Sequence, residues 1–383
     1  MTKKKKRPAI PLHTQLKLWT LAAGRCEFLG CNKFLLRDDL TLSEGNYSNI
    51  AHIIAWTPAG PRGDKTLSQK LARDISNLML VCQKHAKLID DQEQRYPVQL
   101  LRIYKEKHET RIRIQTDIQQ ERKTTVLRFQ SNIRGRKVEI PIADVYEALI
   151  AENRYPADER GILIDLTNFD YSTGESFWDA ASRQTTTVIQ RELSTGHSTS
   201  KPNHLSLFAL APIPLLVHLG FSIGNVIPAD IYLRTRKSGG RWSLCDHGSN
   251  ANPVQLTVRR NNIESDSKTV ILSVSLSGTT PSAVMATLIG GSNPFYEITT
   301  ANPNVDILSS QADIEEFRKA YRDLLTEIRE RHGKAIEIHL FAAVPSPVAI
   351  ICGRELIHGV DPPLVVYEHR NQDQEFFPAL KVV

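Results

Sequence analysis

The chain has 383 residues, of which 41% are hydrophobic and 23% are charged, and its formal net charge is +6. This composition is that of a globular, soluble protein, and the length is sufficient for two or three ordinary cores. A basic run opens the chain and no apolar stretch follows it, which excludes a secretory signal and a membrane anchor and makes a cytoplasmic location the expectation.

The positive charge is concentrated near the N-terminus. Residues 1–123 carry 23 Lys and Arg against 13 Asp and Glu, a net charge of +10, so the rest of the chain has a net charge of −4. A field of this sign attracts a polyanion such as DNA, whose phosphates dominate non-specific affinity. The Lys3–Arg7 run alone is explained equally well as a solubilising tail.

The first part of the chain is predicted to be a compact metal module between two helices. Apolar spacing predicts a helix at 13–24, and a second helix, charged and polar on most faces, is expected at 95–122. Between them lie two short ligand pairs with C-x4-C and C-x2-H spacing, separated by a long loop, and this is the usual pattern of a closed, structural zinc site. The predicted Zn²⁺ ligands are Cys26, Cys31, Cys82 and His85. We expect the other two cysteines, Cys245 and Cys352, to be reduced core thiols.

Two residues between the ligand pairs are candidates for catalysis. His52, in the sequence Ala-His-Ile-Ile, is the candidate general base that would deprotonate an attacking water. Asn77 directly precedes an apolar run and is expected to hold the base-bearing loop in register through its amide. The structural alternatives are a core histidine and a turn-capping asparagine.

A helix is expected to open at Cys82 and to carry one catalytic ligand. Positions 86 and 90 lie four residues apart on one helix face, but only Asp90 has a donor atom for a divalent ion such as Mg²⁺, because residue 86 is Ala86. No base-reading element is recognisable, so contacts with double-stranded DNA are expected to lack sequence preference. Candidate phosphate contacts besides Lys3–Arg7 are Arg62, Lys65, Lys84 and Lys87.

The rest of the chain alternates short apolar runs with amphipathic stretches, which favours α/β layers. We divide the chain into a metal-module domain at 1–125, a linker at 126–155 and a second domain at 156–383, giving an α+β protein overall. Expected strands are 161–166, 204–211, 227–233, 269–276, 336–342 and 364–368. Expected helices are 176–193, 214–220, 282–288 and 313–332.

An internal repeat supports a duplicated α/β unit. Leu207–Gly220 and Leu340–Gly353 share a Phe-Ala and a later Pro-x-Pro at a constant offset of 133 positions, with pseudo-repeats at about 156–260 and 261–383. Each copy turns from a strand into a helix at the strand's carboxyl end, where open α/β sheets bind ligands. A rigid turn that touches no ligand explains the prolines equally well.

The whole chain resembles the HNH-SAVED effector endonucleases of bacterial cyclic-oligonucleotide-based anti-phage signalling systems (CBASS). The resemblance lies in the zinc ligands, in Ala51–Ile54 with Gly60–Gly63, in Asn77, in Leu88–Asp90 and in the paired Pro-x-Pro units. It implies a zinc-stapled ββα-metal nuclease domain and a SAVED domain of two fused CARF/Rossmann-like halves. It also implies that a cyclic di- or trinucleotide binds the SAVED domain and drives homo-oligomerisation, which activates DNA degradation.

The chain departs from the family at Ala86. Similar chains have a second histidine there as a ligand of the catalytic metal, so we expect this chain to have weak or no nuclease activity. An ungated HNH restriction-type nuclease and a catalytically dead module that binds DNA or cyclic nucleotide are the alternatives.

Candidate contacts to a cyclic oligonucleotide are backbone amides and hydroxyls for its phosphates, and guanidinium groups and flat rings for its bases. An ordinary turn and a plain hairpin are the structural alternatives for the two loops involved. The candidates are Tyr171, Arg234, Arg236, Arg241, Trp242, Ser277, Gly278, Thr279, Thr280, Pro345, Ser346 and Pro347.

Overall fold

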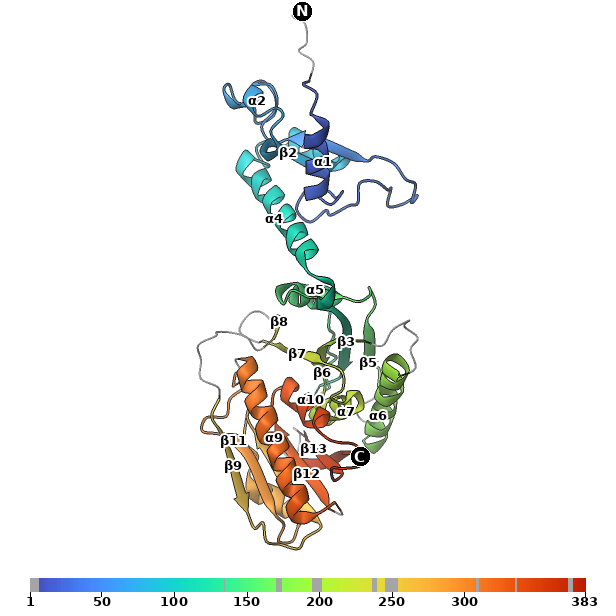
Figure 1. Cartoon of the computed structure of the whole chain (residues 1–383), viewed down its shortest axis with the longest axis vertical. Coiled ribbons are helices and arrows are strands. Elements are labelled where there is room, and N and C mark those ends of the chain that lie inside the picture. The colour runs from blue at the N-terminus through green and yellow to red at the C-terminus, as the bar shows by residue number, and fades with distance from the viewer. Residues whose placement is uncertain are drawn as a thin grey trace, which may run out of the picture. The chain divides into compact units, whose positions relative to one another are not determined.

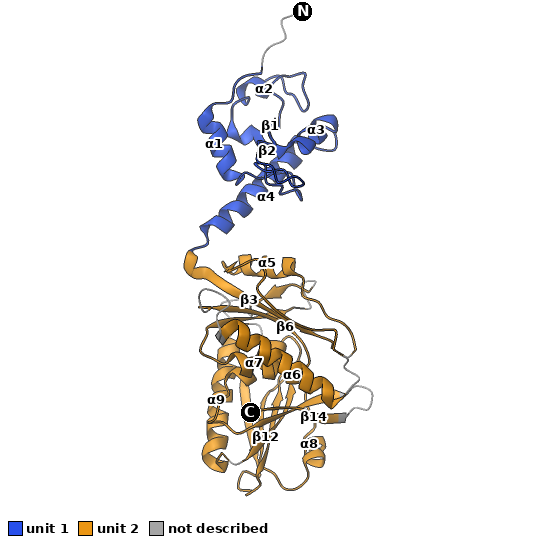
Figure 2. Cartoon of the chain, turned by 90° about the vertical axis from the view of Figure 1, so that its right-hand side faces the viewer, with its two compact units in different colours: residues 1–119 blue, residues 120–383 orange. Residues whose placement is uncertain are grey.

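The computed structural model divides the chain into two compact units, residues 1–119 (unit 1) and residues 120–383 (unit 2), coloured separately in Figure 2. We describe each unit by itself. The residues that the structure describes are 7–133, 135–169, 174–194, 202–235, 240–244, 254–307, 310–334, 336–370 and 375–383.

Unit 1 is built around a two-stranded sheet flanked by helices. Strands β1 (Ser48–His52) and β2 (Leu78–Cys82) pair antiparallel, with Ser48 opposite Cys82 and His52 opposite Leu78. All five residues of β2 are buried, which accounts for its continuous apolar sequence. The helices are α1 (Leu12–Leu21), α2 (Leu67–Lys70), a 3-10 turn at Ile75–Asn77, α3 (Gln83–Asp91) and α4 (Val98–Asp117).

The order β1, β2, α3 confirms that a helix opens directly after Cys82, which is the residue before the first turn of α3. The core of unit 1 is formed by β2 with apolar residues of α1, α3 and α4, including Leu18, Ile89 and Leu101, which are at most 1% exposed. The zinc ligand candidates Cys26 and Cys82 belong to the same core. This small core therefore reaches directly to the predicted metal site.

Unit 2 contains two mixed sheets in the described residues. The first has the order β4-β3-β6-β7-β8, and β5 also pairs with β3. All its pairings are parallel except β7 with β8. Its strands are β3 (Lys123–Ser131), β4 (Tyr155–Pro156), β5 (Ile162–Leu166), β6 (Leu205–Leu210), β7 (Ala229–Arg234) and β8 (Trp242–Ser243).

The second sheet has the order β14-β13-β12-β10-β11-β9, parallel in the middle and antiparallel at both edges. Its strands are β9 (Leu256–Asn261), β10 (Thr269–Ser275), β11 (Phe295–Thr300), β12 (Glu337–Ala343), β13 (Leu364–Arg370) and β14 (Glu375–Val382). The helices of unit 2, seen in Figures 1 and 2, are α5 (Ile142–Ala151), α6 (Glu175–Ile189), α7 (Ile213–Ile223), α8 (Ser282–Ile289), α9 (Gln311–His332) and α10 (Ser346–Arg354).

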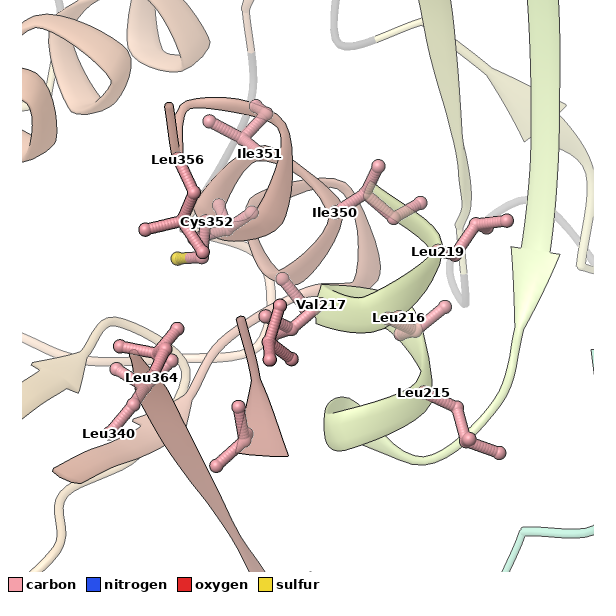
Figure 3. Close-up of a cluster of buried hydrophobic side chains, with 14 of the residues drawn as sticks. Leu215, Leu216, Val217, Leu219, Leu340, Ile350, Ile351, Cys352, Leu356 and Leu364 are labelled. Carbon is pink, nitrogen blue, oxygen red and sulfur yellow. The ribbon is translucent and has the colours of Figure 1, made fainter. Parts of the chain in front are cut away.

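The two repeat copies meet at a helix crossing. The first copy forms β6 and α7 and the second forms β12 and α10, so each is a strand, a Pro-x-Pro turn and a buried helix, as the offset predicts. Helices α7 and α10 pack side by side, with the apolar side chains of both gathered in one cluster (Figure 3). At the crossing, a Cβ on Gly220 would lie 2.0 Å from the Ile350 carbonyl oxygen, and a Cβ on Gly353 would lie 1.8 Å from that of Val217. Only glycine permits this approach.

The structure corrects the expected linker. Residues 126–155 include most of β3, which pairs with β4, β5 and β6 inside the first sheet, and all of α5. The first half of unit 2 therefore starts near residue 120, ahead of the expected boundary at 156. The sequence did not predict β9, which is half-exposed, β14, whose pairing with β13 has a register shift, or β11, which is mostly buried. Among the described residues, no helix has the length and apolar character needed to cross a membrane.

Candidate metal centre and nuclease site

The four predicted zinc ligands come together in unit 1. One ligand atom each from Cys26, Cys31, Cys82 and His85 lies within 4.8 Å of all the others, and this is the one such cluster in the described part of the chain. The His85 Nδ1 atom lies 3.2 Å from Cys82 Sγ and 3.6 Å from Cys26 Sγ. A tetrahedral zinc ion with three thiolates and one imidazole requires ligand atoms about 3.5–3.8 Å apart. The donor set fits zinc in chemistry, and the ligand atoms are gathered to within about 1 Å of the spacing that zinc requires.

The surroundings hold these ligands in place. The His85 ring stacks on Phe28 with ring centroids 4.0 Å apart, and the Cys82 amide donates to Cys26 Sγ at 3.3 Å. Burial raises the pKa of the Cys26 thiol far above its ordinary value, and the neighbouring Cys82 and Cys31 raise it further. A thiol in this position therefore becomes a thiolate only with a cation beside it. Whether zinc is bound stays a prediction.

His52 lies at the end of β1 and is buried, with 8% of its surface exposed. Its Nε2 atom is 2.9 Å from the Ala72 carbonyl oxygen, which can only accept, so Nε2 carries the proton and Nδ1 presents a lone pair. Burial lowers the pKa of His52; the charge of Arg7 lowers it further, whereas the Ala72 carbonyl and Asp90 raise it. A neutral imidazole with an oriented lone pair is what a general base requires.

Asn77 locks the loop that follows His52. Its Oδ1 accepts from the Ile54 amide at 2.8 Å, and its Nδ2 donates to the Ile54 carbonyl at 2.9 Å and to the Leu71 carbonyl at 3.3 Å. The side chain is 1% exposed, so none of these bonds can be replaced by water. The structure therefore gives Asn77 the contacts expected of a residue that holds the base-bearing loop in register.

The residues expected to hold a catalytic divalent ion do not form a site for it. Ala86 offers a methyl group, and Asp90 Oδ1 accepts from Arg62 Nη2 at 2.8 Å. The charge of Asp90 is thus compensated by a guanidinium, and Ala86 supplies no second ligand on the same helix face.

The same geometry corrects the role expected for Arg62. Its side chain is only 5% exposed, its Nε donates to the Ile53 carbonyl at 2.8 Å, and its Nη1 donates to the Ile89 carbonyl. Arg62 therefore fastens the loop after β1 to α3 and is not available to a phosphate. The exposed side chains of Lys65, Lys84 and Lys87 remain candidates for phosphate contact.

In unit 2, two of the predicted ligand segments lie at one sheet edge. Strands β10 and β12 are parallel neighbours with Ser275 opposite Ala343, so their carboxyl ends coincide. The segments that follow them are Ser277–Thr280 and Pro345–Pro347. The Ser277 amide already donates to the Ala343 carbonyl at 2.8 Å and the Thr280 side chain is buried, so only part of the first segment can serve as a phosphate cradle.

The other ligand candidates are divided in the structure. Arg234 and Arg241 are exposed beside the carboxyl end of β7, where Arg234 Nε donates to the Gly240 carbonyl at 3.1 Å. The stacking role expected for Trp242 is wrong. Its side chain is 5% exposed and packs edge-on against Phe208, so the ring is not available to a base. Tyr171, Arg236 and the thiol candidate Cys245 lie outside the described residues.

Pro347 also lines a small cavity between the two halves of unit 2. The other lining residues are Ala229, Asp230, Ile231, Gln311, Ile314 and Arg318. These residues come from β7, α9 and α10, so the cavity lies against the helix that begins at the second Pro-x-Pro turn.

The sequence reading missed a buried ion pair next to the metal cluster. Glu27 is fully buried; its Oε2 accepts from the Leu80 amide at 2.5 Å and its Oε1 lies 3.6 Å from Lys105 Nζ. The pair ties the loop after Cys26 to β2 and α4. No spacing signal connects residues so far apart, so the pair could not be found from the sequence.

The second half of the chain matches a known protein family. Residues 181–382, more than half of the chain, match the family described as "SMODS-associated and fused to various effectors sensor domain" (SAVED). No curated protein sequence matches the chain at a significant level.

Solved structures of receptors show a distant likeness. The Cap4 SAVED/CARF-domain containing receptor of Acinetobacter baumannii with the cyclic trinucleotide 3'3'3'-cAAA has 12% identity and a TM-score of 0.46, covering 84% of this chain and 67% of that chain. The same receptor with 2'3'3'-cAAA has 12% identity and a TM-score of 0.46, covering 83% and 66%. The Moraxella osloensis Cap4 receptor has 14% identity and a TM-score of 0.40, covering 78% and 60%. This chain thus spans about two thirds of these receptors or less.

Proposed function

The chain belongs to the SAVED sensor-domain family, and from this premise we propose that it is an effector of bacterial anti-phage defence whose unit 2 binds a cyclic oligonucleotide. The family match over residues 181–382 is the observation that carries the proposal. Cyclic trinucleotides are the ligands of the two Acinetobacter receptor complexes, so this ligand class is the first to test.

The architecture of unit 2 supports this ligand class. Ser277–Thr280 and Pro345–Pro347 follow adjacent parallel strands, and Arg234 and Arg241 lie exposed at the carboxyl end of β7. The carboxyl edge of a parallel sheet is where open α/β folds bind nucleotides. Helices α7 and α10 begin at such edges and contact each other closely at Gly220 and Gly353. A ligand bound at these edges would therefore affect the packing of the two halves of unit 2 against each other. Ligand-driven homo-oligomerisation is part of the proposal.

We further propose that unit 1 is an HNH nuclease module for double-stranded DNA. Three side-chain placements support this: the cluster of candidate zinc donors, the His52 ring with its proton on Nε2 and its lone pair on Nδ1, and Asn77 bonded to the loop after the base. His52 would take the proton of the attacking water, and Asn77 would keep its loop fixed while it does so. A divalent ion such as Mg²⁺ supplies charge stabilisation at the scissile phosphate in this chemistry.

This chain is proposed to be impaired in that reaction. Ala86 has no donor atom, and Asp90 is paired with Arg62 at 2.8 Å, so the side chains present leave the catalytic cation without a site. The same two observations favour a second function, a module that binds DNA and cyclic nucleotide without cutting.

Cleavage of supercoiled plasmid by Ala86→His protein, with magnesium and a panel of cyclic di- and trinucleotides, tests the proposal. We expect cutting only in the presence of one nucleotide, and none by the chain as it stands. The control is the double variant Ala86→His with His52→Ala, which should lose about a hundredfold or more in rate because the base is removed. Its thermal stabilisation by the nucleotide should not change, since that ligand binds unit 2.

Each outcome separates the candidates. Cutting without any nucleotide would favour an ungated, restriction-type HNH nuclease. A melting shift with a cyclic nucleotide but no cutting by Ala86→His would favour the binding module. If no nucleotide tested produces a melting shift and none produces cutting, both halves of the proposal are contradicted.

A further inference from the structure

Both nitrogens of the His52 ring have partners within the protein. Nε2 donates to the Ala72 carbonyl at 2.9 Å, and Nδ1 lies 3.2 Å from Arg7 Nη2. The same Nη2 atom donates to the Ile50 carbonyl at 2.6 Å. A guanidinium nitrogen carries two protons and never accepts, so Arg7 donates one proton to Ile50 and the other to the lone pair of His52.

This contact conflicts with the role proposed for His52. The lone pair on Nδ1 can accept one hydrogen bond, and a water that is to be deprotonated must occupy that position. Arg7 and the attacking water therefore cannot both bond to Nδ1. The base is available only after the guanidinium has moved away.

The surroundings indicate where the guanidinium would go. Arg7 is exposed and lies five residues before α1, so it is held by two hydrogen bonds and not by burial. Apart from Arg7, the charged group that acts on His52 is Asp90 of α3, and Asp90 is already paired with Arg62. An ionised phosphate is a stronger acceptor for a guanidinium than a neutral imidazole, and it can accept two parallel hydrogen bonds.

We propose that Arg7 is a positioning residue that moves from His52 to a phosphate of bound duplex DNA, so that the base nitrogen is freed only when substrate is present. The inference rests on the proposed role of His52 as general base.

Two measurements on the full chain test this without any cleavage. The first is the pKa of His52 by NMR titration, with the signal assigned through a His52→Gln variant. Arg7→Ala should raise that pKa, because a positive charge and a donor to the lone pair are lost. Lys17→Ala, which removes an exposed positive charge on α1, is the matched control and should leave it unchanged.

The second measurement is the salt dependence of binding to a short blunt DNA duplex. Arg7→Ala should reduce the slope of log Kd against log salt by about one, as the loss of one phosphate contact does. Lys17→Ala should keep the original slope. Arg7→Lys should restore most of the slope, because the charge is kept, but not the full effect on His52, because the forked donor is lost.

An unchanged His52 pKa in Arg7→Ala would overturn the contact, and an unchanged salt slope would overturn the transfer to phosphate. Both readouts are independent of catalysis. Failure of Ala86→His to cut plasmid therefore counts against the nuclease proposal and leaves the two Arg7 readouts unaffected. An unchanged His52 pKa or salt slope in Arg7→Ala counts against the Arg7 proposal and leaves the cleavage result unaffected.

Discussion

The crossing of α7 and α10 predicts a large effect from the smallest possible substitution, Gly353→Ala. The added Cβ would lie 1.8 Å from the Val217 carbonyl oxygen and 2.7 Å from the Phe221 amide nitrogen, whereas real Cβ atoms essentially never approach closer than 3.0 Å. Both obstacles are backbone atoms of α7, so no side chain can turn aside. The helices must separate by at least the difference of 1.2 Å between 3.0 and 1.8 Å.

The loss in the free energy of unfolding comes from the core residues that separation of α7 and α10 would expose. Leu215 to Val217 and Val348 to Cys352 are at most 1% exposed, so separation of the helices loosens the centre of the core of unit 2 (Figure 3). Overpacking of a core costs about 1–3 kcal/mol, and a backbone clash belongs at the upper end. Replacing a helical glycine by alanine returns about 1 kcal/mol through helix propensity. We expect a net loss of about 2 kcal/mol in the free energy of unfolding of unit 2.

Differential scanning calorimetry of the full chain measures this loss. For a unit of this size, about 2 kcal/mol corresponds to a decrease of about 4–8 °C in the Tm of the unit 2 transition. Gly220→Ala should behave alike, since its Cβ would lie 2.0 Å from the Ile350 carbonyl oxygen. The control is Gly278→Ala, whose Cβ would meet only Ala343 Cβ, at 3.8 Å. Equal Tm values for Gly353→Ala and Gly278→Ala would refute the close crossing.

Three further predictions concern mainly unit 1. Asn77→Ala should lower the free energy of unfolding of unit 1 by about 2–4 kcal/mol in a denaturant titration, because the buried amide and carbonyl of Ile54 lose their partners. A loss no larger than that of a substitution at an exposed position would contradict this. Cys31→Ser should reduce zinc measured by elemental analysis from one ion per chain towards none and melt unit 1, and unchanged metal content would disprove the ligand set. Burial lowers the pKa of His52 and of His218 in unit 2 below the ordinary 6.5, so the unfolded chain binds more protons below that pH. The contribution of these two histidines to the free energy of unfolding is complete above about pH 6.5 and declines as the pH falls. Melting scans near pH 5.5 should therefore give lower Tm values than scans near pH 7.5, and equal values would refute the lowered pKa of the two histidines.

Much of the candidate site could be predicted from short sequence patterns. The four candidate zinc donors come together as their spacing predicts, and Asn77 makes the amide contacts expected from its place before β2. The strand, Pro-x-Pro turn and helix recur in both repeat copies at the expected positions. These predictions succeed because each depends on residues close in sequence or on a duplication that can be read directly.

Contacts between distant segments could not be predicted in this way. Arg62 was expected on the surface, but it binds the backbone of the loop after β1 and of α3 and pairs with Asp90. The ring of Trp242 was expected to be free, but Phe208 covers it. Asp90 lies 28 residues from Arg62, and Phe208 is similarly remote from Trp242 in sequence, so no local pattern of an arginine or an aromatic ring identifies such a partner.

By itself, the sequence determined which four residues are candidate zinc donors, the candidate pair His52 and Asn77, the absence of a donor atom at Ala86 and the duplicated α/β unit. Only the tertiary structure decided that β3 is an inner strand of unit 2, that Arg7 occupies the His52 lone pair, and that two glycines permit α7 and α10 to cross. The physical reason is that side-chain type and local spacing set which chemistry a segment can perform. Which donor reaches which acceptor is set by the packing of segments whose separation along the chain leaves no local trace.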